Sequence, residues 1–592
     1  MRLLGYRTVD ALVEWLSDGG QPPLRTATPG EMEERLGSLE PVAAPFDDAL
    51  RTLFDDVLPF SSRSAHPRFF AYVPFAGTWP GALGDFVASA CNVYAGSWQE
   101  SAGPTQLELR ILDWFKDWIG YPAAAGGSLV NGGSAANLTA LACARERLVG
   151  SMRDDLVVYA SDQAHYSLGR AARTLGFRPD QLRVLPVGED LRLEPAILDA
   201  AIAADEAAGR LPLLVVANGG ATSTGAVDPL AELAGVCRER GVWLHVDAAY
   251  GGFAVLTERG RAALHGLALA DSVTLDPHKW LYQPYECGCL LVRDGRALRR
   301  TFEIHADYLR DAEVAMGIVN FSDLGIQLTR STRAFKLWLS LRTFGVDAFR
   351  DAIDRTLDLA QHARERIEAS DALELAAPPS LGVVCFFRHG ADDEDTDGLS
   401  AALEESGIGF ISTTRVHGRS ALRLCILNHT STAEDVDAVL EFLETAKPRG
   451  ATQGYERHEQ LPTTVPLFAR LEPPEARALA ALSTECEVDA GAAVVSRWET
   501  SRDFYVIEDG LVDVLLEDQL VATLRTGDYF GEIAALEWGA RFAKPRIATV
   551  VARCPTRLRV LEPAALQELL EEFPRLESEI RHTAHRRIRE TL

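Results

Sequence analysis

The sequence predicts an α/β protein with a mostly parallel sheet, joined to a small all-β module near the C-terminus. From about 125 to 295, short apolar runs such as LPLLVV (211–216) and VWLHV (242–246) alternate with helical stretches such as NLTALACARERL. Strand and helix in alternation favour a parallel sheet covered on both faces. Between 480 and 560, short strands of alternating polarity are separated by Gly and Asp turns, a pattern typical of a small β-barrel. The 592 residues also exceed what one hydrophobic core holds.

Five segments follow one another along the chain. The first is helical, the second holds the predicted sheet and ends in a long helical stretch, and the third has the mixed pattern of a small α+β domain. The stretch KPRGATQGYERHEQLPTTVP has little periodicity and many turn formers, which indicates a linker. The β-barrel and a helical tail complete the chain. The expected bounds are 1–80, 81–365, 366–446, 447–465 and 466–592.

The composition excludes several classes of function. A formal net charge of −26 repels phosphate backbones and argues against a nucleic-acid partner. No apolar run approaches the roughly 18 residues of a membrane span, and the first residues lack a secretion signal, so we expect a cytoplasmic protein with no membrane partner. Nine scattered cysteines without metal-ligand spacing predict reduced thiols and no metal site. Five lysines against 54 arginines are typical of a GC-rich bacterial genome.

Two features at the ends of predicted strands suit an anionic, ring-containing ligand. The turn NGGSAAN (131–137) precedes a helix, so its glycines and the helix N-terminus suit a phosphate. A plain helix entry is the alternative. Asp247 ends the run VWLHV, where a buried carboxylate needs a partner such as a protonated pyridine nitrogen. The alternative is that Asp247 only caps the following turn.

Two further residues extend this set. Lys279 follows VTLDPH in an apolar setting that partly desolvates the amine and suits it to a Schiff base. The alternative is a lysine whose stem packs at a domain edge. His165, in SDQAHYS, has a flat ring suited to cover one face of an aromatic cofactor, although a lone histidine is more often a satisfied core or surface residue. The order of the four features makes the set more specific than any member.

The motifs SDQAHYS, HVDAAYGG and DPHKW resemble those of the group II decarboxylases that depend on pyridoxal 5′-phosphate (PLP), the family of aromatic-L-amino-acid decarboxylase. The resemblance covers about 1–446, from HPRFFAYVP to ALRLCILNHTST. It implies PLP fold type I (aspartate-aminotransferase-like) and an obligate homodimer. It also implies that Lys279 holds PLP, Asp247 pairs with the pyridine nitrogen and His165 stacks on the ring. The other implied contacts are those of Gly133, Ser134 and His278 with the phosphate and of Ala249 with the second ring face.

The resemblance implies a substrate pocket at the dimer interface, around Tyr72, Phe75 and Trp98. These aromatic side chains suit an aromatic amino acid, and core packing is their alternative. A tyrosine on a mobile loop is associated with proton transfer in the family. Our register places Phe321 there, although Tyr308 lies nearby in the sequence. Because phenylalanine has no proton to give, slow protonation, another donor or diversion to an aldehyde would follow.

The segments VATLRTGDYFGEIAAL and KPRIATVVA resemble the phosphate-binding cassette of cyclic nucleotide-binding domains, over about 466–592. By that resemblance, Glu532, which follows Gly531, bonds the ribose hydroxyl, and Arg546 pairs with the cyclic phosphate of cAMP or cGMP. The insertion EWGARFAK lengthens the cassette, and Arg541 competes for the arginine role. An empty, structural barrel is the alternative.

The sequence therefore predicts an enzyme that decarboxylates an L-amino acid, expected to be aromatic, to the amine and CO2. We expect its activity or assembly to respond to the C-terminal module. Two alternatives stay open. One is a decarboxylation-dependent aldehyde synthase, and the other is a catalytically idle scaffold that responds to a nucleotide.

Overall fold

The computed structural model describes residues 1–37, 39, 41–73, 76–304, 318–448, 483–495, 503–516, 519–526, 528–531, 548–562 and 566. The chain forms two compact units, Met1–Arg449 and Gly450–Leu592. Most of the expected linker and nearly all of the expected helical tail lie outside the described residues. None of the described helices is long and apolar enough to cross a membrane.

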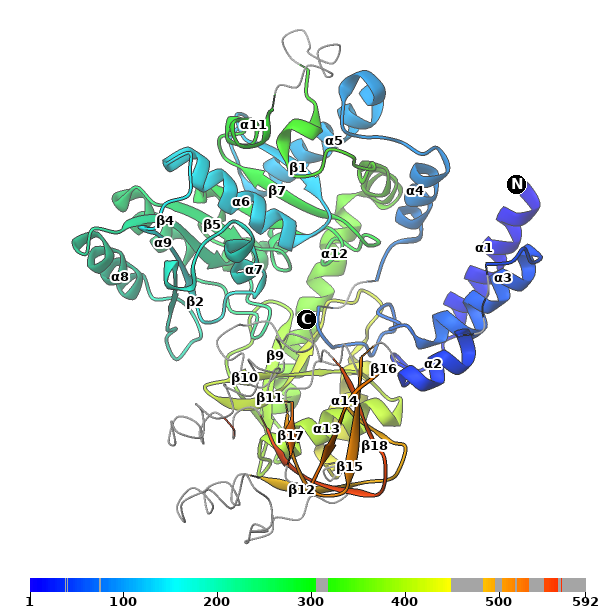
Figure 1. Cartoon of the computed structure of the whole chain (residues 1–592). Coiled ribbons are helices and arrows are strands. Elements are labelled where there is room, and N and C mark those ends of the chain that lie inside the picture. Colours follow the sequence, from blue (N-terminus) through cyan, green and yellow to red (C-terminus); the bar gives the residue numbers. More distant parts are fainter. Residues whose placement is uncertain are drawn as a thin grey trace. The chain divides into compact units, whose positions relative to one another are not determined.

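A seven-stranded mixed sheet forms the centre of the first unit (Figure 1). The strand order is β1-β7-β6-β5-β4-β2-β3, and within this sheet β7 runs antiparallel to both of its neighbours, while the other pairs are parallel. The bounds are β1 (Gly126–Val130), β2 (Leu156–Ser161), β3 (Leu182–Leu185), β4 (Leu211–Asn218), β5 (Trp243–Asp247), β6 (Ser272–Leu275) and β7 (Gly288–Val292).

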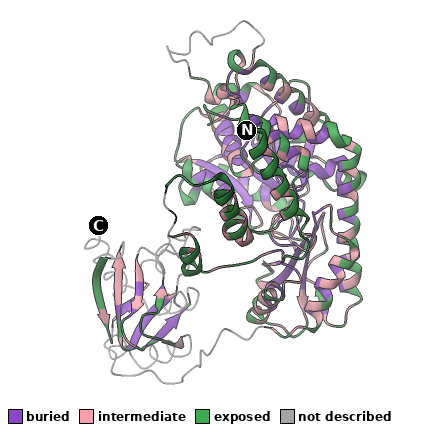
Figure 2. Cartoon of the chain, turned by 90° about the vertical axis from the view of Figure 1, so that its right-hand side faces the viewer, coloured by how far each residue is buried: buried purple, intermediate pink, exposed green. Residues whose placement is uncertain are grey.

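The strands are apolar along most of their length because core packs against both faces of the sheet. In β2, Val157 and Tyr159 belong to one core cluster, whereas Val158 and Ala160 belong to the other. This alternation follows from the strand geometry, which points successive side chains to opposite faces. Figure 2 shows the buried strands within the more exposed helices.

Helices connect the parallel strands and cover the sheet. The segment between β5 and β6 instead holds a short helix and 3-10 turns, η4 (Gly252–Leu256) among them. The α-helices of this domain are α4 (Trp79–Ala90), α5 (Trp98–Ile119), α6 (Gly133–Leu148), α7 (Ser167–Thr174), α8 (Pro195–Ala207), α9 (Leu230–Arg240), α10 (Glu258–Ala263), α11 (Arg296–Phe302) and α12 (Ala334–Glu368).

A small antiparallel sheet follows, with the strand order β10-β11-β9-β8. Its elements are β8 (Leu373–Leu375), β9 (Val383–Arg388), α13 (Asp393–Ser406), β10 (Ser412–Val416), β11 (Arg419–Cys425) and α14 (Ala433–Thr445). The buried Arg423 of β11 donates hydrogen bonds to the carbonyl oxygens of Thr222 (2.6 Å), Ser223 (3.1 Å) and Tyr72 (2.6 Å). This side chain therefore ties the small sheet to a loop of the large domain and to the N-terminal segment.

The N-terminal helices α1 (Arg2–Ser17), α2 (Pro29–Leu36) and α3 (Phe46–Thr52) contain no buried residue. Figure 1 draws them in dark blue, apart from the central sheet. Several large apolar side chains of α1 are exposed, namely Leu3, Leu4, Tyr6, Val9, Val13 and Leu16. Such a run of exposed apolar side chains marks a surface that another surface covers.

The described part of the second unit is antiparallel β structure. Two four-stranded sheets have the orders β12-β19-β14-β17 and β13-β18-β15-β16. The bounds are β12 (Thr484–Val488), β13 (Ala493–Val495), β14 (Phe504–Asp509), β15 (Leu511–Leu516), β16 (Gln519–Arg525), β17 (Tyr529–Phe530), β18 (Thr549–Ala552) and β19 (Thr556–Leu561). One core cluster joins both sheets through residues such as Ile507, Val512 and Leu558. The small barrel that the sequence predicts is thus present.

Candidate active site

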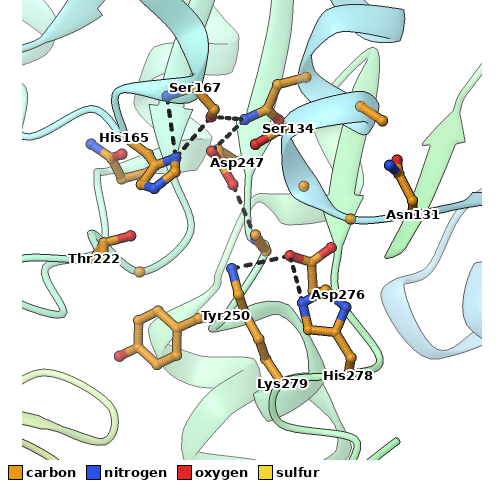
Figure 3. Close-up of a pocket in the computed structure, with 17 residues that line it drawn as sticks. Asn131, Ser134, His165, Ser167, Thr222, Asp247, Tyr250, Asp276, His278 and Lys279 are labelled. Atoms are coloured by element: carbon orange, nitrogen blue, oxygen red, sulfur yellow. Dashed lines mark hydrogen bonds and ion pairs between the residues drawn. The ribbon is translucent and has the colours of Figure 1, made fainter. Parts of the chain in front are cut away.

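A cavity of about 340 Å³ lies at the carboxyl ends of the central strands (Figure 3). Ligands of open α/β sheets bind at this edge because the loops that follow neighbouring strands meet there. The lining comes from the segments after β1, β2, β4, β5 and β6, and it includes Gly133, Ser134, His165, Thr222, Asp247 and Lys279.

The beginning of α6 supplies a cradle for an anion. This helix begins at Gly133 without a side-chain cap, so its first backbone N–H groups have no partner from a capping side chain. The preceding Gly132 has φ +154°, a conformation that other residues rarely adopt. A Cβ atom on Gly133 would lie 3.0 Å from Asp276 Oδ2 and 3.2 Å from the Ala249 Cβ atom. Glycine therefore keeps this wall of the cavity open.

Asp247 places a carboxylate on the floor of the cavity. It ends β5 and is 8% exposed. The amide of Asn137 donates to its Oδ2 at 2.7 Å, and the backbone N–H of Ala249 donates to its Oδ1 at 3.1 Å. These two hydrogen bonds fix the orientation of the carboxylate, which suits a cationic ring nitrogen.

His165 lies across the cavity from Lys279, after β2 (Figure 3). Its Nδ1 lies 2.8 Å from Ser167 Oγ, and the backbone N–H of Ser167 donates to the same nitrogen at 3.3 Å. Burial lowers the pKa of His165, and the nearby Asp247 carboxylate opposes this effect only in part. The imidazole is therefore neutral at neutral pH and presents a flat ring to a ligand.

Lys279 lies in the connection between β6 and β7. Its Nζ is 3.0 Å from Oδ2 of the buried Asp276, and Nε2 of His278 is 3.6 Å from the same oxygen. The backbone N–H of Cys287 donates to His278 Nδ1 at 3.1 Å, and burial lowers the pKa of His278 to about 4. Asp276 Oδ1 has no hydrogen-bond partner among the described residues. An amine, a carboxylate and a neutral imidazole thus share one wall of the cavity.

The structure brings most of the predicted cofactor residues into this cavity. All of the residues expected to contact PLP line it, namely Gly133, Ser134, His165, Asp247, Ala249, His278 and Lys279. The predicted substrate residues are not brought there. Tyr72 is 65% exposed, and Trp98 begins α5 away from the lining. Phe75 lies outside the described residues.

Phe321 lies in the core of the large domain, and its role on the loop stays a prediction. It is 1% exposed in the 3-10 helix η7 (Phe321–Leu324), belongs to the core of the large domain, and lies under the guanidinium of Arg330 at 4.8 Å. The ring is absent from the cavity lining, because packing in the core takes it inward. Tyr308, the other residue considered for the loop position, lies outside the described residues.

In the second unit, Gly531 follows β17 with φ +91°, and Glu532 and Arg546 lie outside the described residues.

Sequence reasoning missed several residues that line the cavity. Asn137 and Asp276 were inside the quoted motifs, NGGSAAN and DPHKW, but had no role assigned. Ser167 and Tyr250 were likewise inside SDQAHYS and HVDAAYGG without a role, and Thr222 follows a strand at the same edge of the sheet, which was its available signal.

These residues fit PLP. The uncapped glycine start of α6 suits the phosphate, Asp247 suits the ring nitrogen, and Lys279 offers an amine to the aldehyde. One feature departs from a simple anion cradle, since the Asp276 carboxylate lies against Gly133.

Comparisons with known proteins agree with this site. Residues 29–389 match the family described as "Pyridoxal-dependent decarboxylase conserved domain", and residues 485–573 match "Cyclic nucleotide-binding domain". The chain is 37% identical over 446 residues to the aromatic-L-amino-acid decarboxylase of Bacillus atrophaeus, covering 74% of this chain and 93% of that relative. It is 33% identical over 397 residues to the phenylacetaldehyde synthase of Petunia hybrida, covering 64% and 78%. The crystal structure of Oryza sativa TDC with PLP and tryptamine superimposes with a TM-score of 0.71 and 31% identity, covering 75% of this chain and 96% of that one.

Proposed function

Since this chain belongs to the pyridoxal-dependent decarboxylase family, we propose that it converts an aromatic L-amino acid to the amine and CO2. The fold is PLP fold type I, and a cyclic nucleotide-binding domain follows the decarboxylase domain. One observation carries the proposal: Lys279, Asp247, His165 and the start of α6 line a single cavity. The names of the relatives support the aromatic substrate.

The roles of the cavity residues follow from their chemistry. When bound, PLP supplies an electron sink for the pair that the departing CO2 leaves behind. Lys279 would hold the cofactor covalently through its amine. Asp247 would hold a proton on the ring nitrogen through a charge-assisted hydrogen bond. His165 and Ala249 would contact the ring.

The backbone of Gly133 and Ser134 would hold the phosphate, with His278 beside it. Because Nδ1 of the neutral His278 accepts from Cys287, its proton is on Nε2, which would donate one hydrogen bond without adding charge. The pocket must also orient the substrate so that the bond to its carboxylate is the one that reacts. The cavity walls therefore decide which bond breaks.

We propose a homodimer in which a second copy covers the N-terminal helices and completes the substrate pocket. The exposed apolar side chains of α1 and the exposed Tyr72 support this arrangement. Tyr72 and Trp98 would then contact substrate next to the partner's cofactor, as would Phe75. Size-exclusion chromatography of the full chain and of a variant lacking residues 1–60 would test it, and a full-length monomer would contradict it.

The cofactor assignment is tested by the absorbance spectrum of the purified protein with PLP. We expect a visible band that Lys279→Ala abolishes and that Lys116→Ala, which removes a lysine paired with Asp113 outside the cavity, leaves intact. A panel of aromatic L-amino acids with CO2 detection then identifies the substrate. No band after addition of PLP would favour the idle scaffold instead.

A second candidate function is the decarboxylation-dependent aldehyde synthase, and the Petunia hybrida relative favours it. In that reaction the amino acid, O2 and water give the aldehyde, CO2, ammonia and hydrogen peroxide. Oxygen uptake and peroxide release in step with CO2 would support it. Stoichiometric amine without oxygen uptake would reject it.

We also propose that cAMP or cGMP binds the C-terminal domain through Glu532 and Arg546 and changes the activity of the decarboxylase domain. Coupling requires a nucleotide that binds one state of the protein better than the other. The test compares decarboxylation by the full chain and by a 1–446 truncation, each with and without the nucleotide. Four equal rates would reject the regulation.

A further inference from the structure

A chain of buried hydrogen bonds runs behind the cavity and ends on two of its walls. It begins at Trp243 in β5, whose indole Nε1 lies 2.8 Å from Ser272 Oγ. Ser272 Oγ lies 2.8 Å from His245 Nδ1, and His245 Nε2 lies 3.0 Å from Asn137 Oδ1. The amide nitrogen of Asn137 then reaches Asp247 Oδ2 at 2.7 Å. Each of these side chains is at most 8% exposed, so water cannot replace a missing partner.

The contact between His245 and Asn137 gives the first links of this chain their direction. An indole N–H can only donate, so Ser272 Oγ accepts from Trp243, and its own proton can go to His245 Nδ1. Burial lowers the pKa of His245 to about 4, so the ring carries a single proton at neutral pH. That proton sits on Nε2 and is donated to Asn137 Oδ1. The other tautomer would set a bare Nε2 against a carbonyl oxygen at 3.0 Å.

The amide of Asn137 is also held in one orientation. Thr274 Oγ1 donates to Asn137 Oδ1 at 2.7 Å, beside the donation from His245. With its oxygen doubly bound, the amide directs its two N–H groups to Asp247 Oδ2 and to Ser167 Oγ, the latter at 2.9 Å. A reversed amide would place its oxygen against the carboxylate, which like charge disfavours.

The same amide supports the tautomer of His165 that the backbone N–H of Ser167 fixes. Because Ser167 Oγ accepts from Asn137, its own proton is free to go to His165 Nδ1 at 2.8 Å. The backbone N–H of Ser167 points at the same nitrogen. His165 Nδ1 is therefore an acceptor, and the proton of the neutral ring is on Nε2.

We propose that Asn137 is a positioning residue that orients the Asp247 carboxylate and directs the Ser167 hydroxyl to His165 Nδ1, and that His245, which does not line the cavity, acts on both through it. The proposal rests on the proposed function, since both controlled groups act on the cofactor there. His245 and Asn137 are joined by their side chains across 108 positions of sequence. The amide of Asn137 thus links Asp247, proposed to pair with the ring nitrogen, to His165, proposed to stack on the ring.

Two substitutions at His245 separate the hydrogen bond from the bulk of the side chain. Glutamine offers an N–H near the position of Nε2, whereas leucine fills space without a donor. We expect His245→Leu to weaken PLP binding about tenfold or more, because Asp247 loses a fixed charge-assisted donor. We expect His245→Gln to stay within about threefold of the unaltered chain. If the leucine variant does not fold, Thr274→Val gives the same test, because it removes the second donor to Asn137 Oδ1. We expect it to weaken PLP binding about three- to tenfold.

The measurements are the PLP dissociation constant, from absorbance titration of the cofactor-depleted full chain, and the pH dependence of the bound-cofactor spectrum. The chain of hydrogen bonds from Trp243 to Asp247, here called the relay, predicts that His245→Leu shifts the pH profile of the bound-cofactor spectrum and that His245→Gln restores it. Leu244→Ala is the matched control, since Leu244 is a buried neighbour in β5 with no side chain hydrogen bond. Equal dissociation constants and pH profiles for the leucine, glutamine and unaltered chains would overturn the relay, as would the same shift in Leu244→Ala. An unaltered chain that binds no PLP would overturn the proposed function itself, and the relay with it.

Discussion

Acidification should destabilise the folded protein through His245 alone by a calculable amount. Burial holds the pKa of this histidine at about 4 in the folded chain, against an ordinary value of 6.5. Between these values the unfolded chain binds a proton that the folded chain does not, so the free energy of unfolding falls as the pH falls. From pH 7.5 to 5.5, one such histidine lowers it by about 1 kcal/mol, because most of the effect comes from the one pH unit below 6.5.

Urea denaturation of the full chain at the two pH values measures this loss. His245→Gln removes the titrating ring, so this variant should lose about 1 kcal/mol less than the unaltered protein over the same pH interval. His278, whose pKa burial also lowers to about 4, contributes in the same direction and is common to both proteins. His389→Gln, at an exposed position, serves as the control and should not change the difference. If His245→Gln loses as much stability as the unaltered protein, then the buried neutral state assigned to His245 is wrong.

Three further substitutions test the site and its support. Glu108→Gln leaves the guanidinium of Arg330 buried without its carboxylate partner, which lies at 2.8 Å with both side chains at most 2% exposed. It should lower the free energy of unfolding by about 3–5 kcal/mol, measured by urea denaturation. Gly133→Ala introduces a Cβ atom 3.0 Å from Asp276 Oδ2 and should weaken PLP binding about tenfold, whereas Gly169→Ala, with open space around it, should not. Asp276→Asn removes a carboxylate beside the phosphate cradle, and this carboxylate is also the partner of the Lys279 amine in the cofactor-free chain. PLP titration should therefore show binding that is about tenfold tighter. Weaker binding would mean that the carboxylate helps to hold the cofactor.

The family and the fold were predictable because their signals are local. Alternating apolar runs gave the sheet, and DPHKW and HVDAAYGG lie within a few residues of the strand ends that present them. The comparisons confirm both the decarboxylase family and the cyclic nucleotide-binding domain. The site roles stay predictions, although the cavity gathers the residues concerned.

What the sequence did not predict depends on partners far apart in the chain. Asn137 meets Ser167 across 30 positions and Asp247 across 110, and no spacing rule connects them. The loop role assigned to Phe321 stays a prediction, and its burial under Arg330 depends on packing that no local pattern specifies.

The extent of the cavity lining along the chain has a consequence for biosynthesis. Every residue that lines it falls between Asn131 and Lys279, and β7, which completes the sheet beside β6, ends at Val292. In this sequence 300 residues follow Val292, and adding them takes roughly 15 to 60 s at ordinary elongation rates. All the residues that line the cavity are therefore synthesised before the small sheet and the C-terminal domain. The order of synthesis allows the cofactor to bind before those later domains fold.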